Sequence, residues 1–510
     1  MENLLPKLDG KDIDNVIYDD VRLTPGTTPQ LILHGKSVDI WQEPYLAHHS
    51  KSPREYIKEK IMEFEKNGED AFPDIVGKAR EKELVKDALF SNSSILLRGE
   101  RGYGKTTLAK AIGKLLPDRI LTIKGCKIYD DPVKPVCFPC KAKVRFNERV
   151  ELLWVPRIWV RIPGDPMMTT RQLIGGISIQ KIREGFDLDH PEVFIPGRAL
   201  KSNRGVGYFD ELGSIPTSLQ TLLHELFEEG QVTTTEGDIL PFKVSTIELA
   251  STNPANYRGT SPIKEPLLDR MESIEIGPPD TLEEEIQIGK MNTYYTKSGI
   301  DPKIPDWHCR ILTRIVRFAR DQNESEVARK VRVSPSCRAT IKLLDHVKSK
   351  AIRSGRQVPI LEDYGPDYEI LSLALDGRME LEYGVKESKR EVIKDLVEES
   401  IRKTGKEIYD LIPEEGFDEF YAELRSLGTS KDGEIFVRLD VPSMEKIKSN
   451  PIVRAVISSI TPNASDVDDE VLLSAMDIVL HSIFVCNPIL VNKSDGGYLM
   501  KEMSEYEERV

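Results

Sequence analysis

Residues 99–106 read Gly-Glu-Arg-Gly-Tyr-Gly-Lys-Thr and match the pattern G-x-x-x-x-G-K-[ST] at every fixed position. The run Ser94-Ile-Leu-Leu-Arg98 before them predicts a buried strand, and Leu108-Ala-Lys-Ala-Ile112 after them predicts a helix. Glycines let the backbone curl so that its N–H groups and the helix N-terminus face phosphate oxygens. The stretch therefore predicts a nucleotide-phosphate site made of Gly99, Glu100, Arg101, Gly102, Tyr103, Gly104, Lys105, Thr106 and Thr107.

Within this loop, two side chains have chemical tasks. Lys105 is expected to neutralise charge on the β- and γ-phosphates, and Thr106 to offer its hydroxyl to Mg²⁺. A second strand, Gly205-Val-Gly-Tyr-Phe209, ends in the adjacent carboxylates Asp210 and Glu211. Because alternate strand residues point in opposite directions, Asp210 can hold the metal while Glu211 polarises the attacking water. Loop and carboxylates together predict an ATPase that requires Mg²⁺.

Three further polar residues follow other predicted elements. Asn253 comes after the strand Ile247-Glu-Leu-Ala-Ser251 and would orient the attacking water. Arg270, in Leu267-Leu-Asp-Arg270, would reach the γ-phosphate of a neighbouring subunit as an arginine finger in a ring. Arg338 opens a later helix and would touch the nucleotide of its own subunit. Each of the three would be an ordinary turn or surface residue if it stood alone.

In this order and spacing, the motifs resemble those of the AAA+ ATPases, and more narrowly the MoxR and magnesium chelatase I-subunit (ChlI-like) branch. The resemblance covers residues 73 to about 375 and includes further runs: Asp74-Ile-Val-Gly77, Leu173-Ile-Gly-Gly176, Phe194-Ile-Pro-Gly197, Asn203-Arg-Gly205 and Leu222-Leu-His-Glu-Leu-Phe-Glu-Glu-Gly230.

The resemblance assigns a role to each motif residue. It implies that Lys105 and Thr106 belong to Walker A, Asp210 and Glu211 to Walker B, Asn253 to sensor 1, Arg270 to the arginine finger and Arg338 to sensor 2. It also implies a hexameric ring, a partner that carries a von Willebrand factor A domain, and remodelling (chaperone) or metal-insertion work.

The expected fold class is α/β: a P-loop NTPase parallel sheet with flanking helices, then an all-α lid, then a mostly helical extension. The predicted boundaries are a leader at 1–70, the nucleotide-binding core at 71–279, the lid at 280–376 and an extension of unknown role at 377–510. In that extension, Ser388 with Glu391 predicts a capping-box helix start, 468–485 a helix and 434–441 a strand.

Composition and charge indicate which classes of partner and which compartment to expect. The net charge of −13 makes nucleic acid an unexpected main partner. The first fifteen residues have neither a basic nor an apolar signal region, so a cytoplasmic protein is expected. The apolar stretch 475–491 contains Asp477, His481 and Asn487, which predicts a buried helix and no membrane span.

Three of the six cysteines are close in sequence. Cys126 precedes Cys137-Phe-Pro-Cys140 by eleven residues, so a Zn²⁺ site is one interpretation, with Asp130 or an outside group as the fourth ligand. Reduced thiols without metal are the other interpretation.

Several functions stay open. The leading one is a mechanochemical ATPase of the MoxR kind, and a magnesium chelatase motor subunit is the alternative within the same class. A DNA-acting transcription or processing ATPase belongs to another class and is opposed by the acidic charge. A nucleotide-binding scaffold without turnover is opposed by the presence of both Glu211 and Arg270.

Overall fold

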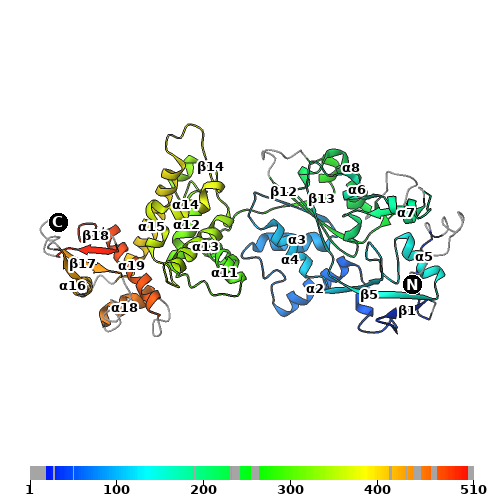
Figure 1. Cartoon of the computed structure of the whole chain (residues 1–510), viewed down its shortest axis with the longest axis horizontal. Coiled ribbons are helices and arrows are strands. Elements are labelled where there is room, and N and C mark those ends of the chain that lie inside the picture. The colour runs from blue at the N-terminus through cyan, green and yellow to red at the C-terminus, as the bar shows by residue number, and fades with distance from the viewer. Residues whose placement is uncertain are drawn as a thin grey trace. The chain divides into compact units, whose positions relative to one another are not determined.

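A computed structural model describes most of the chain and divides it into two compact units. The described residues are 16, 19–26, 29–49, 51–187, 190–229, 231–232, 242–253, 263–412, 416–431, 434–439, 450–460, 468–494 and 496–502. Unit 1 is Met1–Gly277 and unit 2 is Pro278–Val510 (Figure 1).

Unit 1 is built around a five-stranded sheet whose neighbouring strands are all parallel. The spatial order is β13-β3-β12-β9-β6, so the first strand in sequence lies between the fifth and the fourth. Such an order requires crossover connections, and it confirms the predicted α/β class. The strands are β3 (Ser94–Arg98), β6 (Trp159–Pro163), β9 (Gly205–Asp210), β12 (Thr246–Thr252) and β13 (Met271–Glu275).

Alternate residues of these strands enter two different hydrophobic cores. Ile95 and Leu97 pack with α2 (Pro53–Asn67), α3 (Ala79–Phe90) and α4 (Lys105–Lys114). Leu96 belongs instead to the core that includes α8 (Thr217–Glu229). The sheet is therefore buried on both faces, which explains its near-continuous apolar runs.

The remaining elements of unit 1 surround this sheet. A second, four-stranded sheet has the order β2-β1-β5-β4, in which β1 lies parallel to β5 and β4 antiparallel to it. Its strands and the shorter elements are β1 (Gln30–Leu33), β2 (Lys36–Ser37), β4 (Arg119–Ile123), β5 (Arg149–Pro156), α5 (Phe138–Phe146), α6 (Thr170–Leu173), β7 (Gly175–Ile177), α7 (Ile179–Arg183), β8 (Phe194–Pro196), β10 (Gln231–Val232), β11 (Phe242–Lys243) and α9 (Glu265–Leu268).

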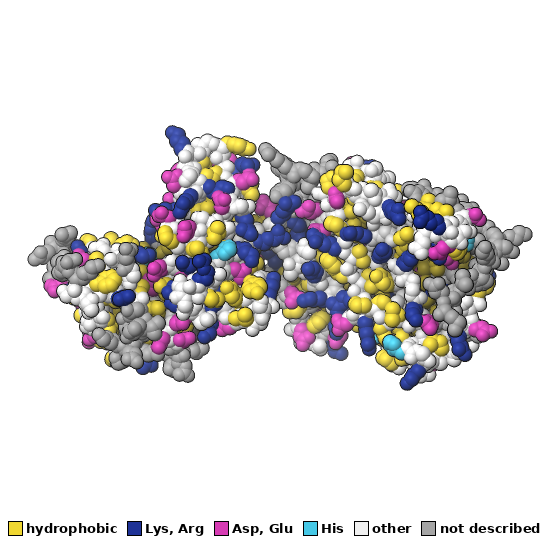
Figure 2. Space-filling view, in the orientation of Figure 1, with side chains coloured by type: hydrophobic (Ala, Val, Ile, Leu, Met, Phe, Trp, Pro, Cys, Tyr) yellow, Lys and Arg dark blue, Asp and Glu magenta, His cyan; other side chains and the backbone are white. Residues whose placement is uncertain are grey.

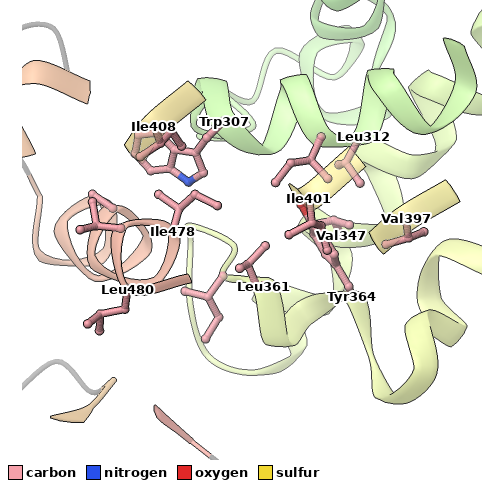
Figure 3. Close-up of a cluster of buried hydrophobic side chains, with 14 of the residues drawn as sticks. Trp307, Leu312, Val347, Leu361, Tyr364, Val397, Ile401, Ile408, Ile478 and Leu480 are labelled. Carbon is pink, nitrogen blue, oxygen red and sulfur yellow. The ribbon is translucent and has the colours of Figure 1, made fainter. Parts of the chain in front are cut away.

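Unit 2 is mainly helical and has one continuous hydrophobic core. Figure 3 shows part of it, with Leu312, Val347 and Ile401 in one cluster. The helices are α10 (Leu282–Asn292), α11 (Tyr294–Lys297), α12 (Asp306–Phe318), α13 (Cys337–Arg353), α14 (Glu369–Leu375), α15 (Lys389–Tyr409), α16 (Phe417–Ser426), α18 (Pro451–Ile460) and α19 (Asp469–Cys486).

Strands of unit 2 fall into two small sheets. The pair β14 (Val331–Val333) and β15 (Glu380–Leu381) is antiparallel. The four-stranded antiparallel sheet has the order β16-β17-β19-β18, formed by β16 (Thr429–Lys431), β17 (Glu434–Arg438), β19 (Gly497–Met500) and β18 (Val491–Ser494). Of this sheet only β17 was expected from the sequence.

Two helix predictions in the second half of the chain are confirmed. The capping box of Ser388 and Glu391 starts α15 with both reciprocal hydrogen bonds, and the helix predicted at 468–485 is α19. The core of unit 2 takes side chains from the predicted lid and from the predicted extension alike, for example Leu312 and Ile401.

The apolar helices contain buried polar residues, and the surface carries charges of both signs (Figure 2). Among the helices that the structure describes, none has the length and apolarity needed to cross a bilayer. In α19, the most apolar of the predicted stretches, Asp477 is buried and accepts a hydrogen bond from Tyr498 (2.8 Å). On the face drawn in Figure 2, Lys and Arg are interspersed with Asp and Glu.

Replacing Ile401 by Ala is expected to lower the free energy of unfolding of unit 2 by about 2–5 kcal/mol, the usual cost of a large cavity in a core. Ile401 is only 4% exposed and packs in the shared cluster. Urea unfolding followed by far-UV circular dichroism measures the change. Leu373→Ala, at a side chain 65% exposed, is the matched control. A single core predicts that all of unit 2 loses stability together. Unfolding of the residues beyond 377 alone, while 278–376 stay folded, would contradict it.

Candidate functional site

The predicted phosphate-binding loop connects β3 to α4 and takes its shape from glycines. Gly99 has φ 149° and Gly104 has φ 93°, values that residues with a Cβ rarely adopt. At Gly99 an added Cβ would lie 2.2 Å from the Ile276 carbonyl oxygen, so this position excludes any side chain. At Gly104 an added Cβ would meet nothing within 4 Å, so the space beside the start of α4 is open.

Lys105 lies inside this loop. Its Nζ donates to the carbonyl oxygens of Gly99 (2.5 Å) and Glu100 (2.8 Å) and to Oδ1 of Asn253 (3.2 Å). The contact with Asn253 follows from the sheet order, because β12 lies directly beside β3 and Asn253 follows β12. Two predicted residues 148 positions apart are therefore in direct contact.

Asn253 also carries an unsatisfied donor. Its Nδ2 is buried and has no hydrogen-bond partner within the described part of the chain. An unpaired buried amide costs free energy unless a ligand or water accepts from it. A phosphate oxygen or an attacking water beside Lys105 would supply that acceptor, which is the fit expected of a nucleotide site.

The Asp210 carboxylate is the centre of a hydrogen-bond network. Its Oδ1 accepts from Ser251 Oγ (2.8 Å) and Tyr208 Oη (3.0 Å), and Tyr208 Oη lies 3.1 Å from Thr106 Oγ1. Arg161 Nε donates to Oδ2 (2.9 Å). Burial opposes the ionised form, but the hydrogen bonds from Arg161, Ser251 and Tyr208 outweigh it and lower the pKa of Asp210. The carboxylate is thus ionised. The Tyr208 hydroxyl connects it to the hydroxyl of Thr106, which is predicted to bind Mg²⁺.

The backbone of Glu211 is fixed in a strained conformation. Its φ is 58°, in the left-handed region, and its N–H donates to Ser251 Oγ (3.1 Å). Gly164 packs so closely that an added Cβ would lie 2.0 Å from the Glu211 carbonyl oxygen. Such a conformation costs roughly 1–3 kcal/mol and persists only where the surroundings impose it.

The side chain of Glu211 is held less tightly. Its Oε1 forms an ion pair with Arg101 of the loop (3.0 Å), and both side chains are substantially exposed. An exposed pair of this kind is worth about 0–1 kcal/mol, so Glu211 can leave it at little cost.

Arg270 lies far from the predicted phosphate-binding loop of its own chain. Strand register pairs Met271 with Ser94, at the start of β3, whereas the loop follows the end of β3. At about 3.3 Å per residue, Arg270 and the start of the loop at Gly99 are about 20 Å apart along the strands. Arg270 instead hydrogen-bonds Glu228 on α8 (2.7 and 2.9 Å). The structure therefore does not bring Arg270 to the site with Lys105.

The other predicted residues occupy less central positions. Arg338 belongs to unit 2, where it is exposed on the first turn of α13. Tyr103 Oη donates to Glu100 Oε2 (3.4 Å) at the rim of the loop, and Thr107 is exposed on α4. The roles given to all these residues remain predictions.

Sequence reasoning missed Tyr208, Arg161 and Gly164. A signal existed for Tyr208, which stands two residues before Asp210 on the same strand and so on the same side of the sheet. Arg161 is the register partner of Tyr208 on the neighbouring strand, and no motif in the sequence marks that pairing.

Replacing Tyr208 by Phe is expected to raise the Mg²⁺ concentration needed for half-maximal ATP turnover by about three- to tenfold. The change removes one hydroxyl that bridges Thr106 and Asp210, and a hydrogen bond of this kind is worth about 0.5–1.5 kcal/mol. Mg²⁺ titrations of the turnover rate at saturating ATP measure the shift. Tyr45→Phe, at a tyrosine outside the hydrogen-bond network of Asp210, is the control, and an unchanged Mg²⁺ requirement in Tyr208→Phe would contradict the bridging role.

A second cluster of possible metal ligands lies between the end of β4 and the first turn of α5. Cys126, Asp130, Cys137 and Cys140 each offer one ligand atom, and these atoms all lie within 4.8 Å of one another. The predicted grouping of the three cysteines is therefore present in space, and Asp130 lies with them.

Curated relatives of the chain are named as magnesium-chelatase subunits. A ChlI homologue of Methanocaldococcus jannaschii is 24% identical over 330 residues, which is 60% of this chain and 85% of that protein. The 38 kDa subunit of Acidiphilium rubrum is 25% identical over 228 residues, which is 42% of this chain and 61% of that protein. ChlI-2 of Arabidopsis thaliana is 28% identical over 34% of this chain and 40% of that protein.

The chain is a distant relative of the magnesium-chelatase ChlI subunits. It spans less than two thirds of the Acidiphilium and Arabidopsis ChlI-type proteins. No protein-family model matches it.

Solved structures give weaker likenesses. A chain from the complex between subunits BchI and BchD of magnesium chelatase has a TM-score of 0.34 and 21% identity, over 61% of this chain and 96% of that chain. The RuvB Holliday junction branch migration motor of Thermotoga maritima has a TM-score of 0.31 and 14% identity, over 86% and 98%. At these TM-scores neither structure supports a functional inference for this ChlI relative.

Proposed function

We propose that the chain is an Mg²⁺-dependent ATP hydrolase whose phosphate site is formed by Lys105, Thr106, Asp210, Glu211 and Asn253. The observation that carries the proposal is the hydrogen bond from Lys105 to Asn253, whose own buried Nδ2 has no acceptor among the described residues. Both residues lie at the carboxyl ends of neighbouring parallel strands. Open α/β sheets bind their ligands at this edge.

Each residue of the site has a task that its surroundings support. When the phosphates bind, Lys105 exchanges loop carbonyls for phosphate oxygens, and Asn253 Nδ2 donates to the attacking water or to a phosphate oxygen. Thr106 and Asp210 would hold Mg²⁺, which neutralises developing charge on the phosphate oxygens. Glu211 leaves Arg101 and accepts the proton of the attacking water.

Nucleotide binding tests this assignment directly. We expect the parent protein to bind ATP with Mg²⁺ and Lys105→Ala to lose that binding, because one of the groups that neutralise the phosphates is removed. Calorimetric titration with ATP and with GTP measures affinity and base preference. Lys114→Ala, at the exposed end of the same helix, is the control. Equal ATP affinity in parent and Lys105→Ala would contradict the site.

We further propose that hydrolysis takes place at subunit interfaces in a ring. The support is the position of Arg270, which lies about 20 Å from its own loop along β3 and so cannot act on its own nucleotide. A neighbouring subunit would have to receive it. The resemblance to AAA+ proteins favours six subunits and gives Arg338 the role of sensor 2.

The work driven by hydrolysis is proposed to be remodelling of a client together with a partner that carries a von Willebrand factor A domain. Support comes from the MoxR-like motifs in the sequence. Client-stimulated ATP turnover in the presence of such a partner would bear this out, and turnover indifferent to it would oppose it.

Metal insertion is the second candidate, and the names of the relatives favour it. In that case the chain would be the motor subunit that supports insertion of Mg²⁺ into a porphyrin. An assay of Mg²⁺ insertion into protoporphyrin with the remaining chelatase subunits separates the candidates, because a remodeller would give no metalloporphyrin.

A further inference from the structure

We propose that Cys126, Asp130, Cys137 and Cys140 form a closed, structural zinc site. The four ligand atoms lie within 4.8 Å of one another, and the Sγ atoms of Cys126 and Cys137 are 4.0 Å apart. Tetrahedral zinc with Zn–S bonds of about 2.3 Å requires ligands separated by about 3.8 Å. Small side-chain movements would therefore suffice to close the site around one ion.

The sulfur separation also argues against a disulfide. A disulfide needs its sulfur atoms about 2.05 Å apart, half the distance between Cys126 and Cys137. All three cysteines are free thiols in the structure. Two of them, Cys137 and Cys140, are buried together with Asp130, and cysteine thiolates are the usual ligands of structural zinc sites.

Asp130 is the fourth ligand of the proposed site. The residue is 0% exposed, and among the residues that the structure covers no Lys, Arg or His is close enough to form an ion pair with its carboxylate, on which Lys141 acts only from a longer distance. A buried carboxylate without a counter-charge is costly, and a divalent cation held by the neighbouring thiolates would supply that charge. An outside group as the fourth ligand is therefore unnecessary.

The surrounding hydrogen bonds hold these ligands in position. The N–H of Cys137 donates to Asp130 Oδ2 (2.8 Å), and the N–H of Asp130 donates to Cys126 Sγ (3.2 Å). Asn203 Nδ2 donates to the Ile128 carbonyl oxygen (3.1 Å) and lies 3.5 Å from Asp130 Oδ1. Metal ligands are commonly oriented by such partners.

The same contacts connect the cluster to the ATPase sheet. Arg204, the residue before β9, donates to the Leu121 carbonyl oxygen (2.6 Å) of β4, and Thr122 Oγ1 donates to the Asp130 carbonyl oxygen (2.9 Å). β9 carries Asp210 at its other end. A zinc ion here would fix the segment between β4 and α5 against the start of the strand that bears the catalytic carboxylates. With all four positions filled by protein, it would leave none for substrate.

Metal analysis of the full-length protein, purified without chelator, tests the site. We expect one zinc per chain by inductively coupled plasma mass spectrometry, and loss of that zinc in Asp130→Asn and in Cys140→Ser. Cys486→Ser, a half-buried thiol in unit 2, is the matched control and should keep the metal. A parent protein without stoichiometric zinc, or an Asp130→Asn variant that keeps full zinc, would overturn the proposal.

Cobalt substitution keeps the test decisive if a variant fails to fold. The parent protein loaded with Co²⁺ should show thiolate-to-metal charge transfer and the strong visible bands of tetrahedral coordination. Asp130→Cys should keep the metal and gain charge-transfer intensity, because a fourth thiolate replaces the carboxylate. Weak octahedral bands in the parent, or unchanged charge transfer in folded Asp130→Cys, would contradict the assigned ligand set. Neither readout depends on ATP turnover.

Discussion

Replacing Glu211 by Gln is expected to lower the ATP turnover rate by about 10²–10⁴-fold, the usual contribution of a positioned general base. The amide keeps the shape of the side chain but cannot accept the proton of the attacking water. ATP should still bind, because Lys105 and the loop are unchanged. Steady-state turnover and calorimetric ATP affinity, measured on the same preparation, separate the two effects.

Glu272→Gln is the matched control, since it removes an exposed carboxylate from β13 in the same unit. The control should keep the turnover of the parent. If Glu211→Gln also turned over ATP at the parent rate, the base would be another group, and the strained backbone at Glu211 would need a different explanation.

Arg270→Ala is expected to lower turnover by about 10³–10⁵-fold, the range for arginine fingers that stabilise transition-state charge. ATP affinity should change little, because the strand register separates Arg270 from the loop of its own chain. Glu228→Gln is the control, since it removes the carboxylate that pairs with Arg270 within the chain while leaving the guanidinium in place. That variant should remain active.

Mixing two inactive variants shows whether Arg270 acts on a neighbour. Lys105→Ala subunits would carry an intact Arg270, and Arg270→Ala subunits would carry an intact phosphate site. Turnover recovered on mixing is the expected result. Mixtures as inactive as their components, or full activity of Arg270→Ala alone, would place the arginine outside the reaction.

The core strands of unit 1 could be predicted from the sequence because they are buried on both faces. Ser94–Arg98 and Gly205–Asp210 are apolar runs bounded by motif residues, and both were found within a residue of their ends. β13 was missed, since only Met271 and Ile274 are apolar in Met271–Glu275, a spacing that is not typical of a strand, and the segment carries no motif. The second sheet was missed because the pairing of β1 with β5 joins segments more than a hundred residues apart.

The candidate site was predictable as a set of residues but not as a geometry. Lys105, Asp210 and Asn253 lie at or after the carboxyl ends of three strands, and only the order β3-β12-β9 explains why Lys105 contacts Asn253. The contribution of Arg161 depends on the register between β6 and β9, which local sequence does not encode. Asp130 lies beside the cysteines because the chain between β4 and α5 folds back on itself. Hydrogen bonds from Asn203 and Arg204 to this segment hold it on that path.

ATP turnover per subunit, measured against protein concentration in the presence of Mg²⁺, tests the central claim most directly. A site completed by a neighbouring subunit predicts a rate per subunit that rises with concentration to a plateau, and loss of that plateau in Glu211→Gln. A protein that turns over no ATP at any concentration, or one whose rate per subunit is constant and unaffected by Glu211→Gln, would contradict ATP hydrolysis at this site.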